Sequence, residues 1–109
     1  MNIRTILLEL GFMPRGFGYK YLLDLLHYGL HNRIFPLNHY GYKYLSETYG
    51  KNIDTIDKCI QNAISSAILR STEAFYNLFS YSIDANRGKP TNKQFIAHIL
   101  MYAADTSIG

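Results

Sequence analysis

The sequence predicts an all-α domain, and three observations support this prediction. Apolar residues recur at intervals of three and four along most of the chain, which places them on one side of a helix. No segment shows the sustained alternation of apolar and polar residues that is typical of a half-buried strand. The 109 residues, 48% hydrophobic and 17% charged, match one compact globular domain in size and composition. We therefore expect a six-helix domain that spans residues 1–109.

Two helices are expected before residue 33, on either side of a turn. The first stops at Gly11, a residue type that often follows a helix directly, and its apolar stripe consists of Ile3, Ile6, Leu7 and Leu10. Pro14 and the glycines of the segment 15–18 favour a turn. The second helix is expected from Tyr19 to about Asn32, with its core side formed by Leu22, Leu25, Leu26 and Leu30.

A third helix is expected from about Asn38 to Tyr49, and a fourth follows the short segment 50–52. The third buries Tyr44, Leu45 and Tyr49 in this prediction. The fourth has the clearest pattern, a narrow seam of small and β-branched residues made of Ile56, Cys59, Ile60, Ala63, Ile64, Ala67 and Ile68. Asn52 or Asp54 can cap its first turn, because their side-chain oxygens accept hydrogen bonds from free backbone N–H groups.

Two further helices are expected in the last part of the chain. A short one runs from Thr72 to Phe79, and a loop with turn residues follows it to Lys89. The motif Pro90-Thr91-Asn92 then introduces a last helix, whose inward side consists of Phe95, Ile96, Ile99 and Leu100.

Composition and motifs exclude several classes of protein. The single cysteine, Cys59, excludes an internal disulfide and a multi-cysteine zinc module, and its place on the apolar seam indicates an inert core thiol. No stretch approaches the ~18–20 apolar residues that span a bilayer, and the first residues lack the features of a signal peptide. We expect a cytoplasmic protein without a membrane partner. No nucleophile or acid–base motif is present, so we expect neither an enzyme nor a cofactor.

The third and fourth helices have the layout of a helix-turn-helix, over about residues 38–70. Only Gly50-Lys51-Asn52 separates them, and a short glycine-containing turn is typical of this motif. The exposed face of the fourth helix carries Lys58, Gln61 and Asn62, residue types that can bind guanine or adenine edges in the major groove. An ordinary solvated helix face carries the same residue types, so this pattern alone leaves both interpretations open. The net charge of +3 permits a polyanionic partner without requiring one.

A second set of polar residues has a spacing that a metal site can use. Asp24, His27 and His31 share a face of the second helix, and His39 is a conceivable fourth ligand. An exposed face with ordinary polar residues explains these positions better, and we predict no metal site.

Three segments of the chain resemble the C-terminal effector domain of the stage 0 sporulation protein A family. The opening GFMPRGFGYKYL meets the family pattern at Gly11, Pro14, Gly18, Tyr19, Tyr21 and Leu22. The segment YLSETYGKNIDTIDKCIQNAI is similar to the region that ends in the family's recognition helix, and KPTNKQFIAHI is similar to its Lys-Pro-Thr-Asn segment. The resemblance extends from about Ile3 to Ala103. It implies a six-helix fold with a helix-turn-helix and an ability to bind DNA.

The chain departs from the family pattern in two respects. The family carries a phosphorylatable receiver domain before this domain, whereas this chain begins with the effector domain, so we expect a stand-alone domain without that switch. In the recognition helix, the family's two arginines are replaced by Lys58 and Gln61, its histidine by Asn62 and a later glutamate by Ser65. An arginine–guanine pair contributes ~1–3 kcal/mol of discrimination, so this chain should not favour the family's target sequence.

Together these features predict a sequence-specific DNA-binding protein, with the helix from Ile53 to Arg70 in the major groove of double-stranded DNA. The expected base-reading residues are Lys58, Gln61, Asn62 and Ser65. The expected phosphate contacts are Lys43, Lys51, Tyr42, Lys89, Thr91, Asn92 and Lys93. Such a protein would act in transcription regulation or as an accessory factor of a mobile element, as a homodimer or beside a related regulator. The alternative is a protein–protein interaction module that kept the fold, lost DNA readout and modulates a related regulator.

Overall fold

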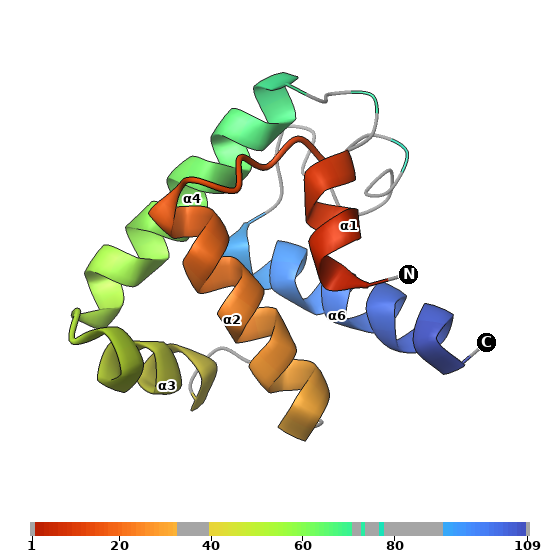
Figure 1. Cartoon of the computed structure of the whole chain (residues 1–109). Helices are drawn as coiled ribbons and strands as arrows, with labels where there is room; N and C mark the ends of the chain where they lie inside the picture. The colour runs from red at the N-terminus through yellow and green to blue at the C-terminus, as the bar shows by residue number, and fades with distance from the viewer. Residues whose placement is uncertain (1, 33–39, 71–72, 74–76, 78–90, 109) are drawn as a thin grey trace.

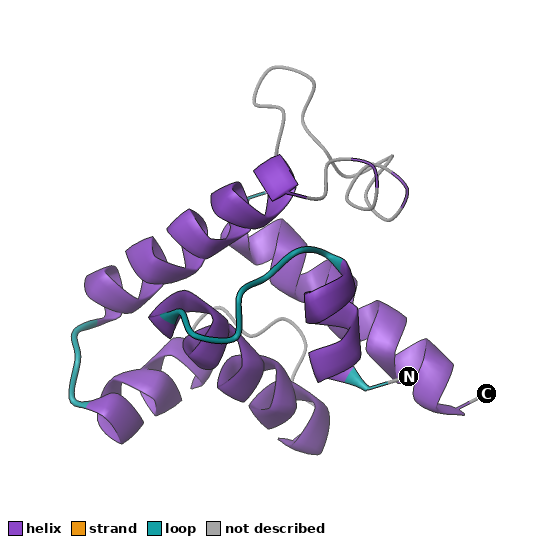
Figure 2. Ribbon diagram, turned by 45° about the horizontal axis from the view of Figure 1, so that its top comes forward, coloured by secondary structure: helices purple, strands orange, loops and turns teal. Residues whose placement is uncertain are grey.

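The computed structural model describes residues 2–32, 40–70, 73, 77 and 91–108. These residues contain no strand (Figure 2), which confirms the all-α prediction. The helices are α1 (Ile3–Glu9), α2 (Phe17–Asn32), α3 (Tyr40–Tyr49), α4 (Ile53–Arg70) and α6 (Asn92–Ile108), shown in Figure 1. The described part thus has five helices, and the prediction of six is corrected to this extent. The helix expected from Thr72 to Phe79 falls almost wholly outside the described residues.

The first two helices have well-defined ends. The Asn2 side chain caps α1, since its Oδ1 accepts a hydrogen bond of 2.8 Å from the Thr5 N–H. Gly11 ends this region with a φ of 91°, in the left-handed conformation that favours glycine. The helix α2 begins at Phe17, two residues earlier than predicted, and the Lys20 N–H donates to the carbonyl oxygen of Gly16 at 3.2 Å.

The core lies around α2, which packs against all four of the other described helices. Figure 1 shows α2 in front of α4, with α1 to one side and α3 at its lower end. The largest fully buried side chains come from every described helix: Leu7, Leu22, Leu25, Leu26, Leu45, Ile56, Ile60, Ile64 and Phe95. Six residues predicted to face the core are only partly buried, because they lie at its edge: Leu30, Tyr44, Tyr49, Cys59, Ala63 and Ile68.

The start of α2 approaches α4 very closely at Gly18. A Cβ atom added at this position would lie 2.4 Å from the carbonyl oxygen of Cys59 and 2.6 Å from the Cβ of Ala63. Any side chain here would therefore push the two helices apart. Glycine at this position holds the first turn of α2 directly against the middle of α4.

Within the described ranges, no helix combines the length and apolar character needed to cross a membrane.

Candidate nucleic-acid interface

The connection between α3 and α4 is a compact turn built by four residues. Gly50 has a φ of 64°, and its N–H donates to the carbonyl oxygen of Ser46 at 3.0 Å. The Ser46 hydroxyl donates to the carbonyl oxygen of Lys51 at 2.6 Å. Asn52 then caps α4, because its Oδ1 accepts from the Thr55 N–H at 2.8 Å. These bonds orient the two helices relative to each other, and Asn52 is the cap that the sequence offered as one of two candidates.

The helix α4 has two distinct faces. Its inner face is almost completely buried and consists of Ile56, Ile60, Ile64 and Ala67. On the outer face Lys58, Gln61 and Asn62 are exposed, and Ser65 is partly buried. The four residues expected to contact bases therefore lie on the side of α4 that faces away from the core.

A polar cluster around Asp57 joins α4 to two other helices. The Tyr42 hydroxyl of α3 donates to Asp57 Oδ1 at 2.8 Å. The Asn92 side chain, at the start of α6, donates from Nδ2 to the same Oδ1 and to the Asp57 carbonyl oxygen, both at 2.9 Å. We call these three residues the Asp57 cluster. Tyr42 and Asn92 were expected to contact phosphates, and in this structure their donor groups are bonded to Asp57.

The environment of Tyr42 stabilises its protonated form. Burial raises the pKa of the Tyr42 hydroxyl, and the hydrogen bond to Asp57 and the negative charge of that carboxylate raise this pKa further. The hydroxyl therefore stays a hydrogen-bond donor to Asp57 well into the alkaline range. The sequence analysis did not identify Asp57 as a partner of Tyr42 and Asn92, and it missed this cluster.

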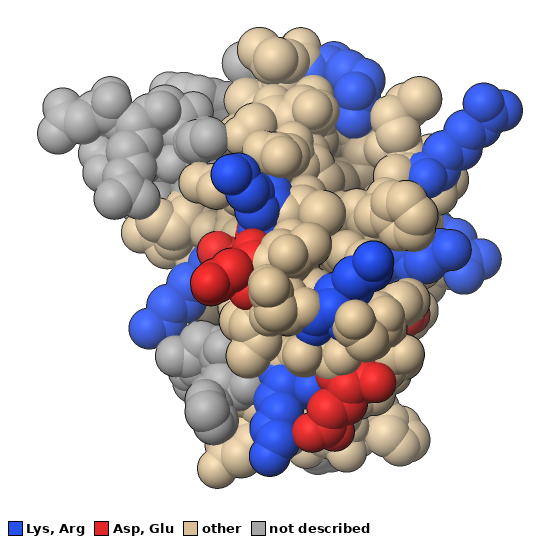
Figure 3. Space-filling view, turned by 90° about the vertical axis from the view of Figure 1, so that its left-hand side faces the viewer, with Lys and Arg blue, Asp and Glu red and all other residues tan. Residues whose placement is uncertain are grey.

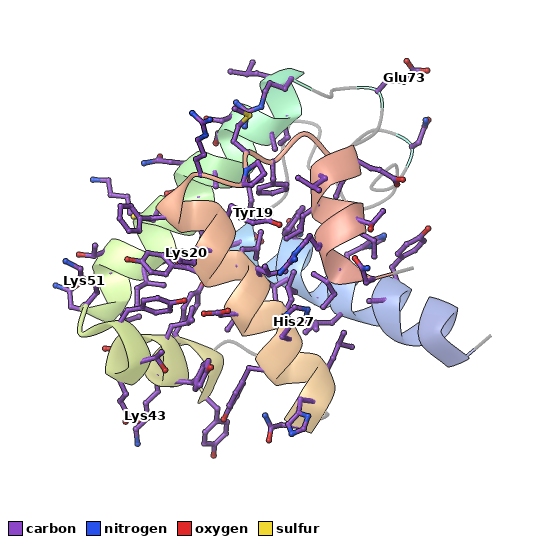
Figure 4. All side chains as sticks on the ribbon, in the orientation of Figure 1. Tyr19, Lys20, His27, Lys43, Lys51 and Glu73 are labelled. Atoms are coloured by element: carbon purple, nitrogen blue, oxygen red, sulfur yellow. The ribbon has the colours of Figure 1, made fainter. Side chains whose placement is uncertain are left out.

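The described lysines expected to contact phosphates come from α3, from the turn before α4 and from the start of α6. Lys43, Lys51 and Lys93 are exposed, and Figure 4 shows Lys43 and Lys51 extending away from the core. Figure 3 shows Lys and Arg side chains scattered over the side that carries α3 and the start of α4, with acidic side chains between them. Lys89 lies outside the described residues. The chain as a whole carries a net charge of +3.

The start of α6 is closed by a reciprocal cap. Thr91 Oγ1 accepts from the Gln94 N–H at 3.1 Å, and Gln94 Oε1 accepts from the Thr91 N–H at 3.0 Å. Thr91 therefore serves as the cap of α6, while the exposed Lys93 remains beside it.

On the opposite flank of α4, Cys59 is partly exposed rather than sealed in the core as predicted. Its backbone carbonyl oxygen lies directly against Gly18 of α2.

On the polar face of α2, Asp24 is bonded to a residue of α3. The carboxylate of this residue accepts a hydrogen bond from the Tyr49 hydroxyl of α3, and the Tyr49 ring meets the Tyr21 ring edge-on at 4.9 Å. His27 and His31 are exposed. Among the residues that the structure describes, no three His, Cys, Asp or Glu side chains are grouped to hold a metal ion.

The fold and the exposed polar face of α4 define an all-helical domain of the kind that regulatory proteins use to bind DNA. Residues 3–102 match the family model described as "Sporulation initiation factor Spo0A C terminal". The match covers nearly the whole chain, so this chain belongs to that family, as the sequence resemblance implied. The family consists of DNA-binding domains that regulate sporulation and is not a family of enzymes.

Proposed function

We propose that the protein is a sequence-specific DNA-binding regulator in which α3, the turn 50–52 and α4 act as a helix-turn-helix. One observation supports this above all: α4 buries the apolar residues of its inner face and leaves Lys58, Gln61 and Asn62 exposed on the other side. A helix with this division can enter the major groove without unfolding any part of the core.

The exposed residues suggest individual roles in DNA recognition. Lys58 is suited to guanine, and the amides of Gln61 and Asn62 are suited to adenine. Ser65 is small, so it allows α4 to lie close to the base edges. The proposed phosphate contacts are Lys43, Lys51, Thr91, Lys93 and, outside the described residues, Lys89.

For Tyr42 and Asn92 we propose a positioning role in place of direct phosphate contact. Both side chains donate to Asp57, which follows the first turn of α4. Their hydrogen bonds fix the orientation of α4 relative to α3 and α6. A fixed orientation keeps Lys58 and Asn62 aligned with the bases.

The biological process follows from the family and from the altered recognition residues. The protein would regulate transcription or assist a mobile element at a sequence different from the family's own target. A net charge of +3 gives one copy only a modest electrostatic attraction to DNA, so we propose that two copies, or one copy and a related regulator, bind adjacent half-sites.

Selection from a randomised duplex pool at two salt concentrations tests this function. The expected result is one enriched sequence and an affinity that falls as salt rises. A plot of the logarithm of the binding constant against the logarithm of the salt concentration should have a slope of about −0.9 per phosphate contacted. Asn62→Ala should relax the preference at one base pair by ~1–3 kcal/mol, whereas Lys43→Ala should weaken binding to all sequences equally. Failure to enrich any sequence, together with salt-independent retention, would refute the proposal.

One observation favours the alternative of a protein–protein module. Leu69 lies on the outer face of α4, one turn beyond Ser65, and is 84% exposed. It is the most exposed large apolar side chain among the described residues, and in this alternative it would contact the partner. If this alternative holds, Leu69→Ala should abolish capture of a related full-length regulator, while the wild-type chain should show no sequence-selective binding to DNA.

A further inference from the structure

A pocket of about 360 Å³ lies beside the outer face of α4, against the start of α2. Asn62 belongs both to this pocket and to the proposed base-reading face, and Ser66 and Arg70 continue the wall at successive turns of α4. Met13 and Phe17 form part of the wall on the α2 side. Their side chains are 52% and 68% exposed, so both are accessible to a ligand at this pocket.

The structure holds both apolar side chains in place relative to α4. Phe17 directly precedes Gly18, whose backbone lies against Cys59 and Ala63. The Phe17 ring stacks on the ring of Tyr21 with centroids 6.2 Å apart, and Tyr21 is buried in the core. The loop that carries Met13 begins at Gly11, whose carbonyl oxygen accepts a 2.6 Å hydrogen bond from Arg70 Nε. The pocket is therefore a fixed feature of the contact between α2 and α4.

The chemistry of the pocket fits one edge of a DNA duplex. Its wall contains the cation Arg70 and no acidic residue, which suits a polyanion. Within the major groove, the group that apolar side chains contact is the C5-methyl of thymine. An α-helix of ~10–12 Å diameter nearly fills a groove ~12 Å wide, so residues beside the helix meet the groove wall, where thymine methyls and phosphates lie.

We propose that Phe17 and Met13 are specificity-determining residues that contact the methyl group of a thymine next to the base read by Asn62. We infer this because these two exposed apolar side chains line the same pocket as Asn62. It rests on the proposed function and specifies the preferred base at one flank of the site. Arg70 supplies positive charge toward the phosphates of the same strand.

The test uses the duplex enriched from the randomised pool. Each thymine is replaced in turn by deoxyuridine, which lacks only the C5-methyl, and the affinity of the full chain is measured. We expect the substitution at one flanking position to lower the affinity by about fourfold, because the burial of one methyl group is lost. Phe17→Ala should lose most of the difference between the thymine and deoxyuridine duplexes, because Met13 alone remains to contact the methyl group, and Phe17→Leu should retain more of it. Met101→Ala, which removes a 64% exposed methionine from α6, is the matched control and should leave the fourfold difference unchanged.

The possible failures are distinguishable. If the wild-type chain binds an enriched sequence but no thymine shows a methyl effect, or if Phe17→Ala retains the whole effect, the inference is wrong and the proposed function stands. The same holds if Phe17→Ala changes only self-association, measured by sedimentation. If no sequence is enriched, the proposed function fails and this inference fails with it. Thermal unfolding of Phe17→Ala and Phe17→Leu checks that both variants fold.

Discussion

The close approach of α2 to α4 at Gly18 predicts a large effect from the smallest possible substitution, Gly18→Ala. The new Cβ would lie 2.4 Å from the Cys59 carbonyl oxygen, where ordinary contacts begin at 3.4 Å. That oxygen belongs to the backbone in the middle of α4, so it cannot swing aside as a flexible side chain can. The two helices must separate, and overpacking of this kind costs ~1–3 kcal/mol.

Two opposing contributions set the expected magnitude. Alanine is favoured over glycine within a helix by about 1 kcal/mol, which offsets part of the cost of overpacking. A contact of 2.4 Å with backbone places the cost of overpacking in the upper part of its range, at about 2–3 kcal/mol. We therefore expect Gly18→Ala to lower the free energy of unfolding by about 1–2 kcal/mol, and each kcal/mol lowers Tm by roughly 4–8 °C.

Chemical denaturation followed by circular dichroism measures this effect. Gly16→Ala is the matched control, because a Cβ there meets its nearest atom, the Met13 carbonyl oxygen, at an ordinary 3.7 Å. Equal stability of the Gly18→Ala and Gly16→Ala variants would refute the idea that close packing at Gly18 positions the start of α2.

Three further predictions concern the polar contacts of α4. Asp57→Ala should lower the free energy of unfolding by ~1–3 kcal/mol, because it leaves the Tyr42 donor and the Asn92 donor without their shared acceptor; Asp54→Asn, an exposed change in the same helix, should cost less than half as much. Because the pKa of Tyr42 is raised in the folded state, deprotonation of this hydroxyl above pH 10.0, the ordinary tyrosine value, favours the unfolded chain. The contribution of Tyr42 to stability is therefore complete below pH 10.0 and decreases as pH rises above it. In alkaline unfolding experiments, the free energy of unfolding of Tyr42→Phe should fall less with rising pH than that of wild type. Asn52→Ala should cost ~1 kcal/mol in thermal unfolding, since the Thr55 N–H loses its cap, and an unchanged Tm would contradict this assignment.

The sequence predicted those elements whose signals are local. The bounds of α4, Ile53–Arg70, follow from its apolar spacing and from the Asn52 cap, and both are as expected. Gly11 and Gly50 were identified as helix-ending residues, and both have positive φ values. Such features depend on neighbours within a few residues, so the chain itself carries the information.

Features that depend on distant contacts were missed. The segment 15–18 was interpreted as a turn because of its glycines, whereas Gly18 is helical and its lack of a side chain serves the contact with α4. Tyr42 and Asn92 were assigned to phosphates, yet they bind Asp57 across 15 and 35 residues of sequence. A polar side chain looks the same in a sequence whether its partner is DNA or another helix.

The separation of the two faces of α4 has an evolutionary consequence. Positions 58, 61 and 62 do not belong to the buried inner face of α4. The hydrogen bonds that join α4 to α3 and α6 are made by Asp57. Exposed substitutions of this kind usually change stability by no more than ~0.5 kcal/mol. Under the proposed function, new target preferences can therefore arise by exchange of a few outward side chains, while the scaffold that presents them stays the same.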